Sequence, residues 1–321
     1  MKILVTGGAG FIGFHVTQAL LSRGDEVIVV DNLNEYYDPS LKINRLAQIK
    51  DHITFYKADI ADYDTLKKIF QEHKFDKICH LAAQAGVRYS LENPFVYEKS
   101  NTLGTLTILE LMKEFNVKDI VLASSSSVYG GNKKIPFSVD DNVDSPISLY
   151  AATKKYNELQ AHVYHHLYGM NCFCLRFFTV YGPWGRPDMA LFKFTKAILE
   201  DQPIEVYNHG HMKRDFTFIA DIVRGILLSL DKVHGYQVLN LGNSNTVELQ
   251  YFISCIEKEL GKKAQQKFLP LQPGDVPITF ADIAKTTEIL GWQPQVRIEQ
   301  GIKEFIKWYL AYYPLHKQLV K

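Results

Sequence analysis

Short apolar runs alternate with longer amphipathic segments along most of the chain. The apolar runs predict strands at Lys2–Thr6, Glu26–Asp31, Ile53–Tyr56, Lys77–Leu81, Asp119–Ala123, Cys172–Phe177 and Gln237–Leu241. The amphipathic segments predict helices at Phe14–Arg23, Asp62–His73, Val96–Phe115 and Tyr150–Tyr168. Strands that alternate with helices are typical of an α/β fold with a doubly wound parallel sheet and right-handed crossovers. Ligands of such a sheet bind at the carboxyl ends of its strands.

Glycine and proline become frequent after Thr179, for example in Tyr181–Pro187, Asn208–Gly210 and Gln272–Asp275. This change predicts two domains, the sheet domain at 1–178 and a smaller, loop-rich α/β lobe at 179–321. A segment near 216–243 is expected to return to the sheet domain. The chain contains no internal repeat and no low-complexity tract.

Gly7, Gly10 and Gly13 are spaced three residues apart between the first predicted strand and the helix that follows it. Glycines at these positions permit a tight turn and allow the backbone and the helix N-terminus to approach a pyrophosphate. Taken alone, they also fit an ordinary strand–turn–helix. Asp31 closes the next strand, near the ~20-residue distance expected of a carboxylate that binds an adenosine ribose. This order predicts a Rossmann dinucleotide site, and NAD over NADP because Asp31 would repel a 2′-phosphate.

Tyr150 and Lys154 are four residues apart on a predicted helix, shortly after the serine-rich run Ser124–Gly130. Residues with this spacing lie on one face of a helix, about one turn apart. A neighbouring ammonium favours the phenolate, so we expect Lys154 to lower the pKa of Tyr150 from about 10. A phenol tuned in this way removes a proton from a sugar or alcohol hydroxyl near neutral pH. The predicted dinucleotide site supplies an acceptor for the hydride on the same carbon.

The 321 residues carry a net charge of +1 without a basic cluster, so neither nucleic acid nor a membrane is predicted as a partner. No apolar stretch approaches the ~20 residues that span a bilayer, and Met1 leads directly into the first strand, which leaves no room for a signal peptide. The cysteines lack Cys-x-x-Cys spacing, and Cys172 and Cys174 are expected in the core on one strand face. A reducing cytoplasm is the predicted compartment.

Three further features have alternative interpretations. His162 and His166 have the spacing of a zinc pair on a helix, but without an accompanying Glu a solvated helix face is favoured and no metal is predicted. Tyr36 and Tyr37 either stack on a base or, as we favour, pack the loop after the second strand. Arg214 is placed at a loop-to-helix junction, where it meets either a phosphate or a neighbouring acid.

Several segments together resemble the extended short-chain dehydrogenase/reductase family, the NAD-dependent nucleotide-sugar epimerases and dehydratases. The segments are Leu81–Pro94, Ser124–Gly130, Ser148–Lys154, Arg176–Met189, Asn208–Gly210, Arg214–Phe216 and Gln272–Val276. The Tyr/Lys pair is shared by the whole superfamily, whereas the Arg176–Met189 segment is far more specific. Within the family, the segments are most similar to the UDP-glucuronate 4-epimerase branch.

The resemblance implies a role for each matching position. Tyr150 is the base, Lys154 holds the nicotinamide ribose, and Ser125 hydrogen-bonds the reacting 4-oxygen. Positions that contact NAD in relatives are Gly7, Gly10, Phe11, Ile12, Gly13, Asp31, Asn32, Asp59, Ile60, Leu81 and Ala83. Positions expected to bind the UDP-sugar are Arg88, Ser125, Ser126, Ser127, Tyr150, Thr179, Arg186, Arg214 and Asp275.

Two departures from the family pattern narrow the expected reaction. Related dehydratases carry Asp-Glu, and UDP-xylose synthases carry Ser-Glu, where this chain has Ser126-Ser127. UDP-galactose epimerases usually have Asn at the position of Thr179 and Arg at that of Gln272. The resemblance therefore implies 4-epimerisation of UDP-glucuronate to UDP-galacturonate through a transient 4-keto sugar.

The 4-keto uronate is a β-keto acid, which loses carbon dioxide when its C5–C6 bond aligns with the carbonyl π system. Ser125, Ser126, Ser127 and Thr179 are expected to hold the carboxylate out of that alignment, with Arg186 as a counter-charge. The alternatives are decarboxylation to a UDP-pentose, epimerisation of UDP-glucose or UDP-galactose, and a catalytically silent NAD-binding sensor. The helices of relatives that correspond to Val96–Phe115 and Tyr150–Tyr168 pair across a two-fold axis, which predicts a homodimer.

Overall fold

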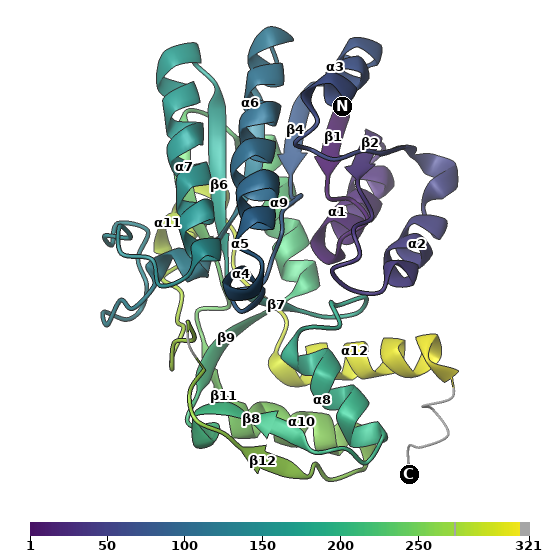
Figure 1. Ribbon diagram of the computed structural model, residues 1–321, viewed down its shortest axis with the longest axis vertical. Coiled ribbons are helices and arrows are strands. Elements are labelled where there is room, and N and C mark those ends of the chain that lie inside the picture. Colours follow the sequence, from purple (N-terminus) through teal and green to yellow (C-terminus); the bar gives the residue numbers. More distant parts are fainter. Residues whose placement is uncertain (273, 315–321) are drawn as a thin grey trace.

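The computed structural model describes residues 1–272 and 274–314, and its centre is a parallel seven-stranded sheet (Figure 1). The strands are β1 (Lys2–Thr6), β2 (Glu26–Asp31), β3 (Thr54–Lys57), β4 (Lys77–His80), β5 (Asp119–Ser125), β6 (Asn171–Phe177) and β10 (Tyr236–Leu241). Their spatial order is β10-β6-β5-β4-β1-β2-β3. The order reverses direction between β1 and β4, and ligands of doubly wound sheets bind beside such a point. The predicted doubly wound α/β fold is confirmed.

Helices cover both faces of the sheet because alternate residues of its strands are buried on opposite sides. On one face α1 (Phe11–Ser22) and α9 (Ile219–Lys232) pack against residues such as Val5 and Val29. On the other, α3 (Tyr63–Glu72), α6 (Gly104–Glu114) and α7 (Leu149–Tyr168) pack against residues such as Leu4 and Ile28. Cys172 and Cys174 belong to this second cluster and are fully buried.

The helix predicted at Val96–Phe115 consists of three parts. It begins with α5 (Pro94–Tyr97), continues through a π-helical segment at Glu98–Leu103 and ends with α6. Asn101 in the π-helical segment is buried, and its side chain accepts the Gln84 N–H and donates to the Gln84 carbonyl. Single π turns inside helices are frequent at functional sites. Here the Asn101 side chain holds the loop after β4.

The lower part of Figure 1 is formed by elements from the second half of the chain. Its strands are β7 (Thr179–Tyr181), β9 (Lys213–Phe218) and β11 (Thr246–Glu248) in one sheet, and β8 (Ile204–Val206) and β12 (Gln266–Phe268) in another. Its helices are α8 (Ala190–Leu199), α10 (Leu249–Leu260) and α12 (Ile298–Tyr312). Two short helices, α2 (Pro39–Ala47) and α4 (Tyr89–Glu92), follow β2 and β4, and α11 (Ala284–Leu290) contacts β10.

The prediction that Arg214 lies at a loop-to-helix junction is wrong. Arg214 lies inside β9, where it pairs with Val247 of β11, and α9 begins at Ile219. The residues after it, Asp215–Phe218, are all buried, so the period-2 alternation that identifies a half-buried strand is missing from the sequence.

Candidate active site

A cavity of about 870 Å³ lies at the carboxyl ends of the parallel strands and extends to the elements of the lower lobe. This volume is at the upper end of the range for ligand sites. It is lined by the predicted residues Gly7, Gly10, Phe11, Ile12, Gly13, Asp31, Asn32, Ile60, Leu81, Ala83, Arg88, Ser125, Ser126, Ser127, Tyr150, Lys154, Thr179, Arg186, Arg214 and Asp275. Asp59 is the predicted residue that does not line it, and its carboxylate forms an ion pair with Lys99 at 2.8 Å.

The glycine loop, residues 7–13, joins β1 to α1 at one end of the cavity and fits a dinucleotide pyrophosphate. A Cβ on Gly13 would lie 2.1 Å from the Gly7 carbonyl oxygen, and one on Gly7, whose φ is +72°, would lie 2.7 Å from the Ala82 nitrogen. Glycine is therefore required for the backbone to fold this closely. Helix α1 starts at Phe11, directly after Gly10, so its N-terminus with its free N–H groups faces the cavity.

Asp31 ends β2 beside this loop. Its carboxylate accepts the backbone N–H groups of Ala9 at 3.1 Å and Leu33 at 2.9 Å, one on each oxygen. Each oxygen has a second lone pair for a ribose hydroxyl. Burial raises the pKa of Asp31, and the N–H of Leu33 and the charge of Lys42 oppose that effect.

Arg45 on α2 is fully buried and connects three loops around the cavity. Its guanidinium donates to the Ala9 carbonyl in the glycine loop at 2.9 Å and to the Tyr37 hydroxyl at 2.8 Å. It also donates to the Trp184 carbonyl at 2.6 Å, in the loop that leads to Arg186. Tyr37 thus contacts Arg45 from the loop after β2 and also lines the cavity.

Tyr150 and Lys154 extend from the first turns of α7, whose N-cap Ser148 accepts the Ala151 N–H. Burial raises the pKa of Tyr150, while the Ser125 hydroxyl and the charge of Arg186 act to lower it. The Lys154 ammonium donates to the Ala123 carbonyl at 2.7 Å, and burial lowers its pKa to about 8 against the opposing charge of Glu158. The prediction that Lys154 lowers the Tyr150 pKa is wrong for this structure, because Lys154 reaches β5 and Arg186 supplies the positive charge.

Arg186 and Asp188 form an ion pair in the cavity wall. The Arg186 guanidinium grips the Asp188 carboxylate with two hydrogen bonds of 2.9 and 2.6 Å, and the Tyr36 hydroxyl donates to the same carboxylate at 3.2 Å. Burial opposes both charges, yet the pair raises the pKa of Arg186 and lowers that of Asp188. Arg186 therefore presents a permanent positive charge beside Tyr150.

Arg88, Arg214 and Asp275, which were predicted to bind the UDP-sugar, lie together at another part of the cavity. Arg88 donates to Asp275 at 2.9 Å and stacks on the Tyr207 ring, 4.4 Å from its centroid. Arg214 donates to the carbonyls of Lys213 and Pro277, both at 3.1 Å, and burial lowers its pKa while Asp275 opposes the shift. Pro273, in the predicted segment Gln272–Val276, lies outside the described residues.

The serine segment, Ser125–Ser127, follows directly from β5. The Ser125 hydroxyl accepts the Ser127 N–H at 3.1 Å and hydrogen-bonds the Ser127 hydroxyl at the same distance. Thr179, at the start of β7, lies across the same cavity. The segment thus presents hydroxyl and amide donors without a carboxylate of its own.

Several residues of the site were not predicted from the sequence. Asp188 and Tyr36 fix Arg186, Lys42 lies beside Asp31, and Asn101 donates to Thr153 next to Lys154 at 3.0 Å. The spacing Arg186-x-Asp188 in the sequence could have indicated this ion pair. Tyr36 is brought in by the loop after β2, Lys42 by α2 and Asn101 by the π-helical segment, none of which the sequence pattern revealed.

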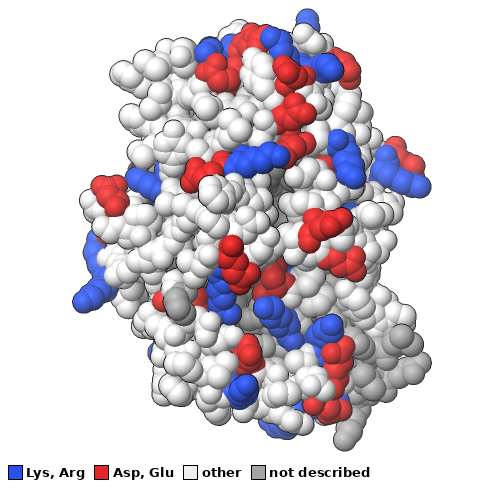
Figure 2. Space-filling view, in the orientation of Figure 1, with Lys and Arg blue, Asp and Glu red and all other residues white. Residues whose placement is uncertain are grey.

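Figure 2 shows acidic and basic side chains interspersed over one face of the molecule, without a large patch of either sign. Within residues 1–272 and 274–314, no group of three or more His, Cys, Asp and Glu side chains is arranged to hold a metal ion. His165 hydrogen-bonds the Met170 carbonyl at 2.7 Å, and His162 contacts the Tyr236 ring edge-on. Over the same described ranges, no helix has the length and apolar character to cross a bilayer.

Comparison with known proteins places these residues in one family. The family described as GDP-mannose 4,6 dehydratase matches residues 4–305. A UDP-glucuronate 4-epimerase of Thermodesulfobacterium geofontis is 49% identical over 308 residues, 95% of each chain. The structure of UDP-glucuronic acid 4-epimerase from Bacillus cereus, in complex with UDP-glucuronic acid and NAD, matches with a TM-score of 0.92 and 36% identity over 98% of this chain and 100% of that one. A UDP-glucose 4-epimerase from Thermotoga maritima, with UDP-glucose, matches with a TM-score of 0.91 and 31% identity over the same shares. The chain therefore belongs to the GDP-mannose 4,6 dehydratase family of extended short-chain dehydrogenase/reductases.

Proposed function

We propose that the chain converts UDP-glucuronate to UDP-galacturonate by NAD-dependent 4-epimerisation. The main support for this proposal is that Tyr150, the serine segment and the glycine loop line one cavity. It occurs in a chain 49% identical to a UDP-glucuronate 4-epimerase. The near-equal TM-scores of the two structural matches, 0.92 and 0.91, do not separate uronate from neutral hexose, so the choice of substrate rests on the side chains and on sequence identity.

Each part of the cavity has a proposed ligand. The glycine loop, Asp31 and Lys154 hold NAD. When bound, NAD would accept a hydride from C4 of the sugar and give it back. Arg88, Arg214 and Asp275 hold the UDP group, with the two guanidinium groups available for phosphate. The sheet domain, residues 1–178 with a segment near 216–243, thus binds the cofactor, and the rest of 179–321 binds the UDP-sugar together with Arg88, Tyr150 and the serine segment of the sheet domain.

Tyr150 and Ser125 perform the proton chemistry. The Tyr150 phenolate takes the proton of the 4-hydroxyl and later returns it, while the Ser125 hydroxyl donates a hydrogen bond to the same oxygen. Burial disfavours the phenolate, and the charge of Arg186 offsets part of this cost. After oxidation, the 4-keto sugar turns its other face before the hydride and the proton are returned.

The carboxylate of the 4-keto uronate must be held while the ring turns. Hydroxyl and amide donors of the serine segment and Thr179 fix its orientation, and Arg186 provides the counter-charge. Dehydratases and UDP-xylose synthases place a Glu where this chain has Ser127, so an acid or base for those reactions is missing from that position. This difference favours epimerisation over decarboxylation, although the matching family is described by a dehydratase.

The test is to incubate the purified protein with UDP-glucuronate, without added NAD, and to identify the nucleotide sugars formed. UDP-galacturonate is the expected product, because the cofactor is regenerated in each cycle and remains bound. A UDP-pentose as the main product would identify a decarboxylase, and conversion of UDP-glucose alone would identify a hexose epimerase. Bound NAD without turnover of any UDP-sugar would identify a sensor.

We also propose that the protein is a homodimer. Leu159, Val163 and Leu167 lie on one face of α7 and are 48%, 47% and 60% exposed. Leu103, which precedes α6, and Leu106, within α6, are exposed as well. An apolar stripe of this kind on adjacent helices suits pairing into a four-helix bundle. Light scattering at micromolar concentration should give twice the chain mass, and Val163→Glu should give a monomer. A monomeric wild-type protein would contradict the proposal.

We further propose that the protein resides in the reducing cytoplasm. All four cysteines are free and buried. Buried, unpaired cysteines suit a compartment in which thiols stay reduced.

A further inference from the structure

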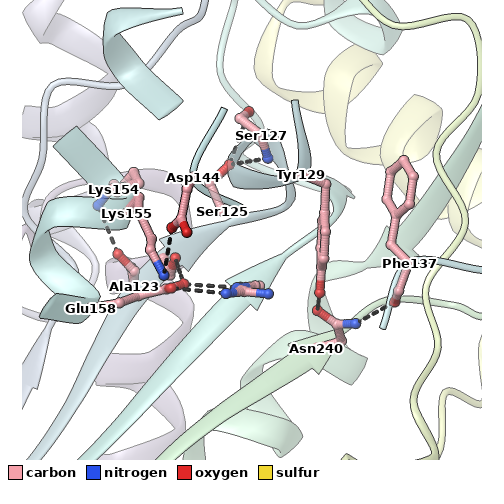
Figure 3. A network of polar contacts seen from close by, with 12 residues as sticks. Ala123, Ser125, Ser127, Tyr129, Phe137, Asp144, Lys154, Lys155, Glu158 and Asn240 are labelled. Atoms are coloured by element: carbon pink, nitrogen blue, oxygen red, sulfur yellow. Dashed lines mark hydrogen bonds and ion pairs between the residues drawn. The ribbon is translucent and has the colours of Figure 1, made fainter. Parts of the chain in front are cut away.

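A buried polar network underlies the serine segment (Figure 3). The residues on either side of the segment, Ser124 and Tyr129, direct their hydroxyl groups into the protein rather than toward the reacting oxygen. Both side chains are nearly inaccessible, with exposed fractions of 2% and 3%. Hydrogen bonds to the protein interior therefore fix both ends of the serine segment.

The first attachment runs from Ser124 to helix α7. The Ser124 hydroxyl donates to Glu158 Oε1 at 2.6 Å. Glu158 lies one turn after Lys154, and the Lys154 ammonium donates to the carbonyl of Ala123, the neighbour of Ser124, at 2.7 Å. Two successive residues of β5 are thus held by two side chains of the helix that also carries Tyr150.

Arg176 on β6 fixes the Glu158 carboxylate. Its Nε and Nη2 donate to the two carboxylate oxygens at 2.8 and 2.9 Å, and the two side chains are 2% and 1% exposed. A buried ion pair is weak evidence for stability, since desolvation of the two charges offsets their attraction. A bidentate pair instead fixes the orientation of the Glu158 carboxylate, and this carboxylate in turn positions the Ser124 hydroxyl.

The second attachment begins at Tyr129, whose ring lies over the Arg176 guanidinium at 4.8 Å. Its hydroxyl donates to Asn240 Oδ1 at 2.7 Å, and Asn240 donates to the carbonyls of Phe137 and Asp282 at 2.8 and 2.9 Å. Figure 3 shows Tyr129, Asn240 and Phe137 in a continuous line beside the strands. The ion pair thus supports both ends of the serine segment.

We propose that Glu158 and Tyr129 are positioning residues that fix the serine segment so that it holds the substrate carboxylate in place during ring rotation. The inference rests on the proposed function. When the carboxylate is free to turn, the C5–C6 bond breaks and carbon dioxide leaves. The electron pair passes into the C4 carbonyl as an enolate, and C5 takes up a proton, which gives a UDP-4-keto-pentose. Glu158 and Tyr129 suppress this branch from outside the cavity lining.

Two mild variants test the inference in the full-length protein with its native cofactor. Ser124→Ala removes the hydrogen bond to Glu158 and leaves the ion pair intact, and Tyr129→Phe removes the hydroxyl and leaves the ring over Arg176. Each should lower kcat about tenfold, as expected for one hydrogen bond to a charged or buried group. KM should stay within about twofold, and the share of UDP-4-keto-pentose should rise about tenfold. Ser124→Thr, which retains the hydroxyl, should recover most of the kcat.

A matched control is Asp221→Asn in α9. Asp221 is also buried and paired with an arginine, Arg224, at 3.0 Å, but it does not line the cavity. This variant should lower the unfolding temperature and leave kcat and the product ratio unchanged. If Ser124→Ala and Tyr129→Phe match the wild type in kcat and product ratio, or change only in proportion to their unfolding temperature as Asp221→Asn does, the positioning role is overturned.

Assays of the wild-type enzyme distinguish a failure of the positioning role from a failure of the proposed function. If it forms no UDP-galacturonate, the proposed substrate is wrong, and the kcat comparison is made with the UDP-hexose that the enzyme does convert. A kcat at the wild-type level in both variants would then overturn the positioning role. A tenfold loss with rescue by Ser124→Thr would support positioning of the serine segment alone and would overturn the role in holding a carboxylate, because a hexose has none.

Discussion

Gly13→Ala sets two opposing effects against each other. Gly13 lies inside α1, where alanine is favoured over glycine by about 1 kcal/mol in an exposed helix interior. The added Cβ, however, would lie 2.1 Å from the Gly7 carbonyl oxygen and 2.8 Å from both Gly7 C and Gly8 Cα, all backbone atoms. Relief of these contacts requires a shift of about 1 Å in the glycine loop, and overpacking of this kind costs about 1–3 kcal/mol. The clash is therefore expected to outweigh the helix preference.

The expected result is a protein that unfolds up to about 3 °C lower than the wild type, from the clash less the helix preference, and is purified with less than a tenth of its NAD. Thermal unfolding and mass spectrometry of the denatured supernatant measure the two effects. Gly131→Ala is the control, because a Cβ at Gly131 meets no heavy atom within 4 Å. A Gly13→Ala protein with full NAD content and an unchanged or higher unfolding temperature would falsify the close-approach role of this loop. NADP as the bound nucleotide in the wild type would instead refute the role given to Asp31.

Three further substitutions test the chemistry of the cavity. Tyr150→Phe should retain NAD and UDP-sugar binding and lose at least ~10²-fold in turnover; turnover near that of the wild type would exclude Tyr150 as the base. Thr179→Val keeps the shape and removes the hydroxyl, so slower epimerisation with UDP-4-keto-pentose and an NADH absorbance is expected, the product ratio changing roughly ten- to a hundredfold; slower epimerisation without these products would leave Thr179 a packing role. Lys154→Met should remove a pH dependence of stability in the NAD-free protein. Because burial lowers the folded-state pKa of Lys154 from 10.5 to about 8, wild-type stability should rise relative to the variant by up to about 3 kcal/mol between pH 8 and 10.5, and parallel unfolding curves for the two proteins would contradict this.

The elements that the sequence predicted well are those with a strong local pattern. Strand Cys172–Phe177 and helix Tyr150–Tyr168 match β6 and α7 to within one residue. Both have a local signal, since the apolar residues of each element, and the N-cap Ser148 of the helix, are close together in the sequence. The two-stranded pairing of β8 with β12 joins residues about 60 positions apart and has no local signal.

The candidate site was predictable to a similar extent. The residues of the glycine loop and the Tyr150/Lys154 spacing were visible in the sequence, and nearly all predicted residues line one cavity. The direction in which Lys154 points was not predictable, because the Ala123 carbonyl that accepts its hydrogen bond lies on a strand distant in the sequence. The same holds for Glu158, whose partners Ser124 and Arg176 come from two different strands.

Arg45 has a consequence for how cofactor preference and sugar handling evolve. Ala9 donates its N–H to Asp31 and accepts a hydrogen bond from Arg45 on its carbonyl, and Arg45 in turn holds Trp184, two residues before Arg186. A continuous chain of contacts therefore leads from the adenosine end of the cavity to the sugar end. A mutation that replaces Asp31 to admit a 2′-phosphate would loosen the support of the loop that carries Arg186. Selection for a different dinucleotide is thus constrained by the sugar that the same protein must turn.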